Sequence, residues 1–113
     1  MGKGFVMRKI NMLLGVTALL ACLLATSGTA LAGTGSGTIS VYHLNSAVPG
    51  RGVCVQMVPA LPNTWACLWK SNALYQELTE LLLQGFLWQK SCTIAWSALD
   101  PNGYLLIEWA ECR

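Results

Sequence analysis

The chain has 113 residues, of which 54% are hydrophobic and only 11% are charged, and its formal net charge is +2. Lys3, Arg8 and Lys9 supply three of the seven basic residues. From residue 33 onward, four basic side chains stand against five acidic ones, a net charge of −1 with His43 neutral. This part holds no cluster of basic residues, which argues against nucleic acid and anionic lipid as partners.

The first 32 residues predict a cleavable signal peptide. A basic start precedes the uncharged, apolar residues 12–24, and Ala30 and Ala32 occupy the two positions that a signal peptidase reads. This apolar core is shorter than the roughly 20 residues that a membrane-spanning helix needs, which disfavours an uncleaved anchor. Lipoprotein processing at Cys22 is a second alternative, disfavoured because apolar residues follow that cysteine. We predict cleavage after Ala32 and a secreted or periplasmic protein without a membrane span.

The remaining chain predicts a single small domain that is mainly β. Residues 33–37 are rich in glycine and predict a flexible leader. Apolar residues at helical spacing follow Ser71 or Asn72, either of which can cap a helix. Period-two alternation predicts strands at residues 38–44, 53–58, 64–69, 91–97 and 104–111. The order β-β-β-α-β-β over residues 38–113 is that of the OB-fold, a small barrel, with an α+β sandwich as the alternative.

Four cysteines remain after the predicted cleavage, and they predict two disulfides in an oxidising compartment. A zinc site is disfavoured because no two of them form a close pair. Three pairings are possible, and hairpin geometry favours one of them. Cys92 and Cys112 are symmetric about Asn102, and Cys54 and Cys67 are symmetric about the turn between them.

Alternation in the first cysteine-bearing hairpin separates a core face from an outer face. The core face consists of Val53, Val55, Met57, Ala66 and Leu68. Gln56, Trp65 and Trp69 share the outer face with the disulfide. The apolar arc of the helix, widened by Tyr75, Leu83 and Phe86, suits either a wholly buried helix or a subunit interface. We place Trp65, Trp69, Tyr75, Leu83 and Phe86 in a candidate interface.

No combination of residues predicts an active site, so we expect neither an enzyme nor a bound cofactor or metal. His43 is the sole histidine and has no acidic neighbour in the sequence. Glu108 and Glu111 point to opposite faces of a strand, so they do not form a catalytic carboxylate pair. Every cysteine after the signal peptide has a use in a disulfide, which leaves no thiol nucleophile.

Short segments between Ser36 and Ser97 resemble one protein family. They are Ser-Gly-Thr-Ile-Ser-Val at 36–41, Cys54 with Ala66-Cys67, Leu74-Tyr75 before the apolar helix, and Thr-Ile-Ala-Trp at 93–96. In order and spacing they are similar to the B subunit of subtilase cytotoxin and to related pertussis-like toxin B subunits. The short loop between the last two strands and the Cys92–Cys112 pair depart from that family's pattern.

The resemblance implies an exported OB-fold protein that forms a ring of five, binds sialylated cell-surface glycans and accompanies a catalytic A subunit. It places a sugar site at Ser36, with Trp96 as the counterpart of an aromatic residue late in the fourth strand. Gln56 can add an amide to that site. The alternative is a monomeric exported domain that contacts another protein as an inhibitor or envelope factor.

Overall fold

The structure, a computed structural model, describes residues 32–113. The predicted signal peptide and the alternative processing site at Cys22 lie outside the described residues, except for Ala32. The described part has the predicted element order β-β-β-α-β-β. Its elements are β1 (Gly33–His43), β2 (Arg51–Val58), β3 (Ala66–Trp69), α2 (Tyr75–Leu87), β4 (Cys92–Leu99) and β5 (Leu105–Cys112).

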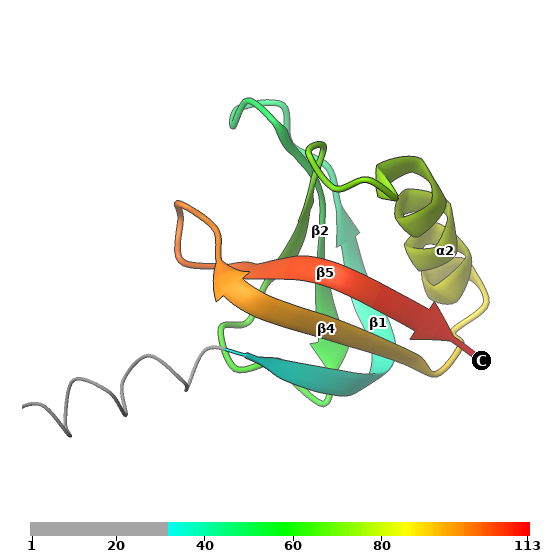
Figure 1. Cartoon of the computed structure of the whole chain (residues 1–113). Coiled ribbons are helices and arrows are strands. Elements are labelled where there is room, and N and C mark those ends of the chain that lie inside the picture. The colour runs from blue at the N-terminus through cyan, green and yellow to red at the C-terminus, as the bar shows by residue number, and fades with distance from the viewer. Residues whose placement is uncertain (1–31) are drawn as a thin grey trace, which may run out of the picture. The chain divides into compact units, whose positions relative to one another are not determined.

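The five strands form one sheet that closes into a small barrel (Figure 1). Around the ring the order is β1-β2-β3-β5-β4, and β1 closes the ring by pairing with β4. All neighbouring strands are antiparallel except β3 and β5, which are parallel. A five-stranded barrel with one helix between the third and fourth strands is an OB-fold arrangement, so the predicted fold class is confirmed.

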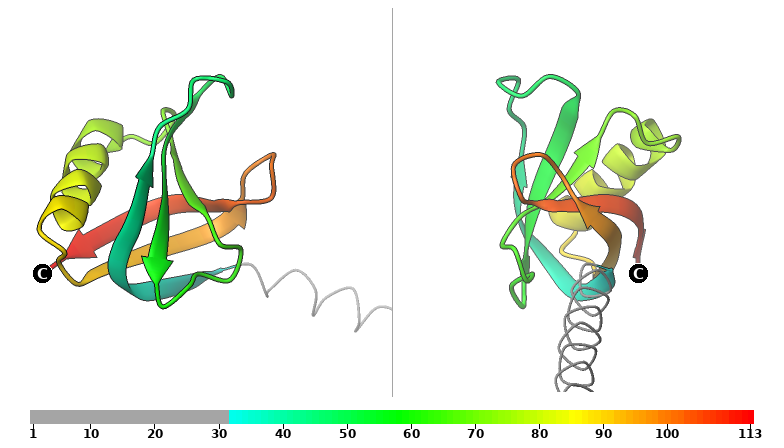
Figure 2. Two further views of the ribbon diagram at one scale, coloured as in Figure 1. Left: turned by 180° about the vertical axis from the view of Figure 1, so that it is seen from behind. Right: turned by 60° about the vertical axis from the view of Figure 1, so that its left-hand side comes forward.

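The first strand spans two neighbours because it is long and bent (Figure 2). Its first half pairs with β4 and its second half with β2. The register shifts between Ile39 and Val41, which leaves Ser40 as an extra residue at the bend. Such a bulge bends a strand and increases its twist, and here it lies close to where β1 passes from one partner to the other.

The prediction of a flexible leader at residues 33–37 is wrong, because these residues are the first half of β1 and pair with β4. Close packing requires glycine there. A Cβ atom at Gly35 would lie 2.5 Å from the Leu61 side chain, and one at Gly33 would lie 2.9 Å from the Trp96 indole. The glycines therefore let the strand pass closely over large core side chains.

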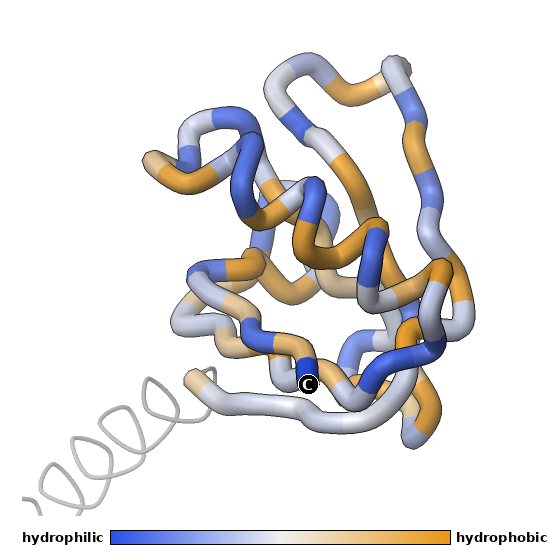
Figure 3. Tube along the Cα trace, turned by 90° about the vertical axis from the view of Figure 1, so that its right-hand side faces the viewer, coloured by the Kyte–Doolittle hydropathy of each residue, from blue (hydrophilic) through white to orange (hydrophobic). Residues whose placement is uncertain are grey.

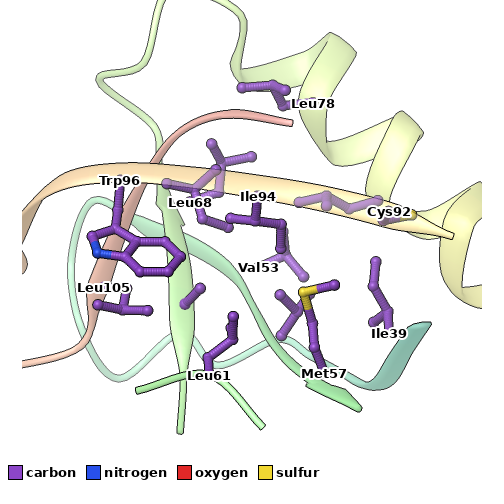
Figure 4. Packing of buried hydrophobic residues seen from close by; sticks show 14 residues of the cluster. Ile39, Val53, Met57, Leu61, Leu68, Leu78, Cys92, Ile94, Trp96 and Leu105 are labelled. Atoms are coloured by element: carbon purple, nitrogen blue, oxygen red, sulfur yellow. The ribbon is translucent and has the colours of Figure 1, made fainter. Parts of the chain in front are cut away.

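Apolar side chains from all five strands and from α2 fill the barrel (Figure 4). Helix α2 packs against β1, β3 and β5. The helix buries Leu78, Leu82 and Gly85 against them. The predicted core face is confirmed, because all five of its residues are buried: Val53, Val55, Met57, Ala66 and Leu68. The core thus consists of a closed ring of strands with one helix against it.

The prediction that Ser71 or Asn72 caps the helix is wrong, because Leu74 is the N-cap residue and no side chain caps it. Asn72 instead holds the turn before α2. Its side-chain oxygen accepts a hydrogen bond from the Leu74 N–H at 2.9 Å. Its amide nitrogen donates to the backbone carbonyl groups of Ile107 and Glu108 on β5, at 3.3 and 3.1 Å. One side chain therefore ties the beginning of the helix to the middle of the last strand.

Two disulfides join Cys54 to Cys67 and Cys92 to Cys112, the pairs predicted from hairpin geometry. Each pair consists of directly opposed residues on neighbouring strands. Helix α2 approaches the second disulfide so closely that a Cβ atom at Gly85 would lie 2.6 Å from the Cys92 sulfur. Because disulfides persist in oxidising surroundings, they indicate an extracytoplasmic compartment. Within residues 32–113, no helix has the length and apolar character needed to cross a membrane.

Candidate functional site

The outer face of β1, β4 and β5 gathers polar side chains in a row across three strands. On β4, Ile94 is fully buried inside the barrel, so its neighbour Thr93 points outward. The register places Ser36 of β1 opposite Thr93 on one side and Glu111 of β5 opposite it on the other. Directly opposed residues lie about 4.5–5.5 Å apart at Cβ, so these three side chains are neighbours.

A pocket of about 230 Å³ surrounds this row, and it is lined by Ser36, Ser91, Thr93, Glu111 and Arg113. The hydroxyl oxygens of Ser36 and Thr93 are 2.7 Å apart and share a hydrogen bond. The Arg113 guanidinium lies 3.4 Å from the Glu111 carboxylate. The Arg113 backbone N–H donates to the Ser91 carbonyl group at 2.8 Å, which fixes the last residue beside the pocket.

The polar groups of this pocket are suited to a ligand that carries many hydroxyl groups. The hydroxyls of Ser36 and Thr93 can each donate and accept a hydrogen bond. The Glu111 carboxylate accepts, and the Arg113 guanidinium donates. Both charged side chains are exposed, and an exposed ion pair contributes only about 0–1 kcal/mol. Either group can therefore turn from its partner to a ligand at small cost.

His43 has a packing role at the end of β1. Its ring centroid lies 5.5 Å from that of Trp65, with the two rings tilted. It is absent from the polar pocket, which therefore has no imidazole base beside its hydroxyl groups. Across residues 32–113, no group of three His, Cys, Asp or Glu side chains is arranged to hold a metal ion.

Of the three residues predicted to contact a sugar, the structure places only Ser36 in the pocket. Gln56 is half-buried on β2, opposite Val41 of β1. The prediction that Trp96 presents its ring to a sugar is wrong, because Trp96 is only 7% exposed and belongs to the core. Figure 4 shows its indole inside the barrel, on the same side of β4 as Ile94.

The two tryptophans of the candidate interface already have partners within the domain. Trp65 packs against His43. The Trp69 indole N–H donates to the Asp100 carboxylate at 3.3 Å. Asp100 is buried, and its other oxygen accepts the backbone N–H of Tyr104 at 3.0 Å. Trp69 therefore helps to hold the β4–β5 turn, whatever further contact it makes.

The helical members of the candidate interface divide between the core and the surface. Tyr75 and Phe86 pack against the core, whereas Leu83 is exposed. Leu87 is 63% exposed and Trp88 is 74% exposed, so the apolar surface extends to the end of the helix. Figure 3, which looks onto α2, shows apolar segments alternating with hydrophilic ones along it. The helix is thus neither wholly buried nor apolar around its whole surface.

Trp109 on β5 is an exposed aromatic residue that the sequence prediction did not include in any site. Strict alternation from Leu105 and Ile107, which are both buried, would place Trp109 inside the barrel as well. In the structure Trp96 pairs with Ile107 but Ala95 pairs with Trp109, so Glu108 is an extra residue. This bulge reverses the alternation and leaves Trp109 45% exposed. No pattern in the sequence marks the bulge.

Two further hollows lie outside the pocket at Ser36. One of about 240 Å³ lies between β5 and the turn before α2, and its lining includes Trp69 and Asn72. The other, of about 390 Å³, lies beside the β1–β2 loop, and its lining includes Arg51 and Tyr75. Neither contains Ser36, Gln56 or Trp96, so the pocket at Ser36 is the one that coincides with a predicted ligand residue.

The described part of the chain is thus a small, disulfide-bonded β domain with an OB-fold arrangement and a hydroxyl-rich pocket on its outer face. Comparison with known proteins finds no matching family model, no matching curated protein and no matching solved structure. The resemblance to toxin B subunits therefore stays a prediction from short sequence segments.

Proposed function

We propose that this protein is an exported, non-catalytic glycan-binding subunit that assembles with copies of itself, similar to a bacterial toxin B subunit. The observation that carries the proposal is the pair of hydrogen-bonded hydroxyls, Ser36 and Thr93, inside a pocket with a carboxylate and a guanidinium. Ser36 is also a residue that the resemblance assigns to a sugar site. The two disulfides support a secreted or periplasmic location.

The exposed apolar end of α2 supports assembly with further copies. Leu83 and Leu87 are four residues apart, so they lie on one face of the helix, and Trp88 adds an exposed indole beside its end. Exposed apolar patches on small soluble domains mark interaction surfaces. The resemblance supplies the stoichiometry of five and the catalytic A subunit as a further partner.

The test of sugar binding uses the exported, oxidised protein on an array of sialylated and neutral glycans. We expect saturable binding that Ser36→Ala and Thr93→Ala each weaken, because each removes one hydroxyl from the pocket. Ser97→Ala is the matched control, since Ser97 is an exposed hydroxyl on the same strand outside the pocket. Binding to no glycan, or equal binding by all four proteins, would overturn the proposed site.

The second candidate function is a monomeric domain that contacts another protein. It is favoured by the same exposed surface, because Leu87 and Trp88 can pack against a foreign partner as well as against a copy. Light scattering after size exclusion distinguishes the two candidate functions. A discrete mass of several protomers, converted to monomers by Leu87→Lys, supports the ring. A monomer at all micromolar concentrations favours the alternative.

A further inference from the structure

We propose that Trp109 is the aromatic platform of an extended glycan-binding surface, on which one sugar ring stacks while its neighbour occupies the pocket at Ser36. The inference rests on the proposed function, and it names the shape of the ligand: an oligosaccharide of at least two residues rather than a single sugar. It also replaces Trp96, which is buried, as the aromatic contact of the site.

The strand register places Trp109 directly beside the polar pocket. On β4, Ala95 is the next outward residue after Thr93, and it pairs with Thr34 of β1 and with Trp109 of β5. A second row, Thr34–Ala95–Trp109, therefore runs parallel to the row that contains Ser36. Outward residues on one strand are about 6.8 Å apart, which is comparable with the length of one sugar residue.

Ala95, in the middle of the second row, is covered by neighbouring side chains. Ala95 points outward, yet it is only 5% exposed, so side chains on the outer face lie over it. Trp109 stands directly opposite Ala95 and is the largest side chain in the row. Trp109 itself keeps 45% of its surface exposed. The indole therefore has surface left for a ligand.

The exposure of Trp109 depends on the bulge at Glu108, which Asn72 holds in place from the turn before α2. The Asn72 amide donates to the carbonyl groups of Ile107 and Glu108 at 3.3 and 3.1 Å. Asn72 is fixed in turn by the Leu74 N–H at the beginning of α2. Bulges commonly re-aim a side chain next to a functional site. Without this one, Trp109 would continue the inward series of Leu105 and Ile107.

The two rows together provide the chemistry that a saccharide needs. A sugar ring presents an apolar face of C–H groups, which packs on an aromatic ring, and a rim of hydroxyls, which needs donors and acceptors. Trp109 supplies the aromatic ring. The hydroxyls of Thr34, Ser36 and Thr93 supply the donors and acceptors. Glu111 adds an acceptor on the same strand as Trp109, two residues along. Sites with few polar groups around an aromatic surface bind small ligands in this manner.

The test compares Trp109→Ala and Trp109→Phe with the unchanged oxidised protein, by titration with sialyllactose and lactose after a glycan array. We expect Trp109→Ala to weaken binding about tenfold, because an aromatic contact is lost, and Trp109→Phe to retain most of the affinity. Leu44→Ala is the matched control, since Leu44 is a large apolar side chain that is 66% exposed and lies outside both the pocket at Ser36 and the exposed end of α2. Thermal unfolding of each variant checks that the fold is intact.

The outcomes distinguish the platform from the function on which it rests. If Ser36→Ala weakens binding but Trp109→Ala does not, the platform is overturned while the glycan-binding pocket stands. If the unchanged protein binds no glycan, the proposed function fails and the platform with it. If Trp109→Phe loses as much affinity as Trp109→Ala, the indole does not act as a stacking surface. If sialic acid alone, titrated in the same way, binds as tightly as sialyllactose, the extended surface is contradicted.

Discussion

The inner and outer faces of β1, β4 and β5 each contain one tryptophan, in opposite surroundings. Trp96 on the inner face packs over the glycines of β1 and is nearly inaccessible to water. Trp109 on the outer face pairs with the residue next to Trp96 along β4 and remains exposed. The difference comes from the backbone, through a bulge of one residue, and not from the residue type. It divides the same three strands into a face that packs the core and a face that carries the proposed glycan site.

The largest expected effect separates the two tryptophans. Trp96→Ala leaves a cavity in the core, and we expect it to lower the free energy of unfolding by about 3–5 kcal/mol. Trp109→Ala removes a half-exposed side chain, and we expect a smaller loss of about 1–2 kcal/mol. Denaturant titration of both oxidised variants measures the difference. Equal losses in the two variants would mean that Trp109 is part of the core.

The two disulfides extend the comparison, because they also lie on different faces. Cys92 belongs to the core cluster and Cys112 packs against it, whereas Cys54 and Cys67 are buried outside that cluster. Replacing either pair with alanine removes a cross-link, at about 2–5 kcal/mol. We expect the Cys92–Cys112 pair to cost more, since its loss also opens a space beside α2. The denaturant midpoints of the two double variants show which disulfide contributes more stability. A lower midpoint for the variant that lacks Cys54–Cys67 would contradict this expectation.

Gly85→Ala tests how closely α2 packs on the inner disulfide. Alanine in place of glycine usually stabilises a helix by about 1 kcal/mol. Here the new Cβ atom would lie 2.6 and 2.8 Å from the two sulfur atoms, so we expect a net loss of about 1–3 kcal/mol.

The control for Gly85→Ala is the same substitution in a chain that carries Cys92→Ala and Cys112→Ala. Without the sulfur atoms the methyl group has room, and the substitution should become neutral or stabilising. A loss that persists in this background would show that the clash involves something other than the disulfide. Gln84→Ala, at an exposed neighbouring position, reports the effect of helix propensity alone.

The smallest expected effect concerns Tyr42, which packs against the core from the second half of β1. Burial raises the pKa of its phenol above the usual value of 10.0, and repulsion from Tyr75 adds to the shift. Above pH 10 the unfolded chain therefore loses the Tyr42 proton before the folded chain does, and stability falls as the pH rises. Tyr42→Phe should flatten this dependence, measured as unfolding midpoints between pH 9 and 11. An unchanged slope would assign the dependence to other groups.

Sequence patterns predicted the element order and the disulfide pairs because both follow from short-range regularities. Alternation marks strands, and symmetric positions about a turn face each other, as Cys92 and Cys112 do. The patterns failed where one extra residue reverses the alternation of a strand. They also failed where glycines suit a packed strand as well as a flexible leader. The bulge at Glu108 moved Trp109 outward, and the glycines of residues 33–37 form a packed strand instead of a leader.

The candidate site was predictable only in part, for a related reason. Ser36 was found through a resemblance between short segments, whereas its neighbours Thr93, Glu111 and Arg113 come from strands far along the chain. Their meeting depends on the closure of the ring and on its exact register. Neither property can be read from one strand at a time, so a pocket assembled across three strands becomes visible only in the structure.

The pairing of β1 with β4 sets the order in which the chain can complete its fold. Ser36 and Thr93, which meet in this pairing, are 57 residues apart in the sequence. The ring therefore stays open while the chain is synthesised, until all the residues between them have been made. Contacts between such distant residues form slowly. The pocket at Ser36 and Thr93 spans this closure, so it can form only when the ring is complete.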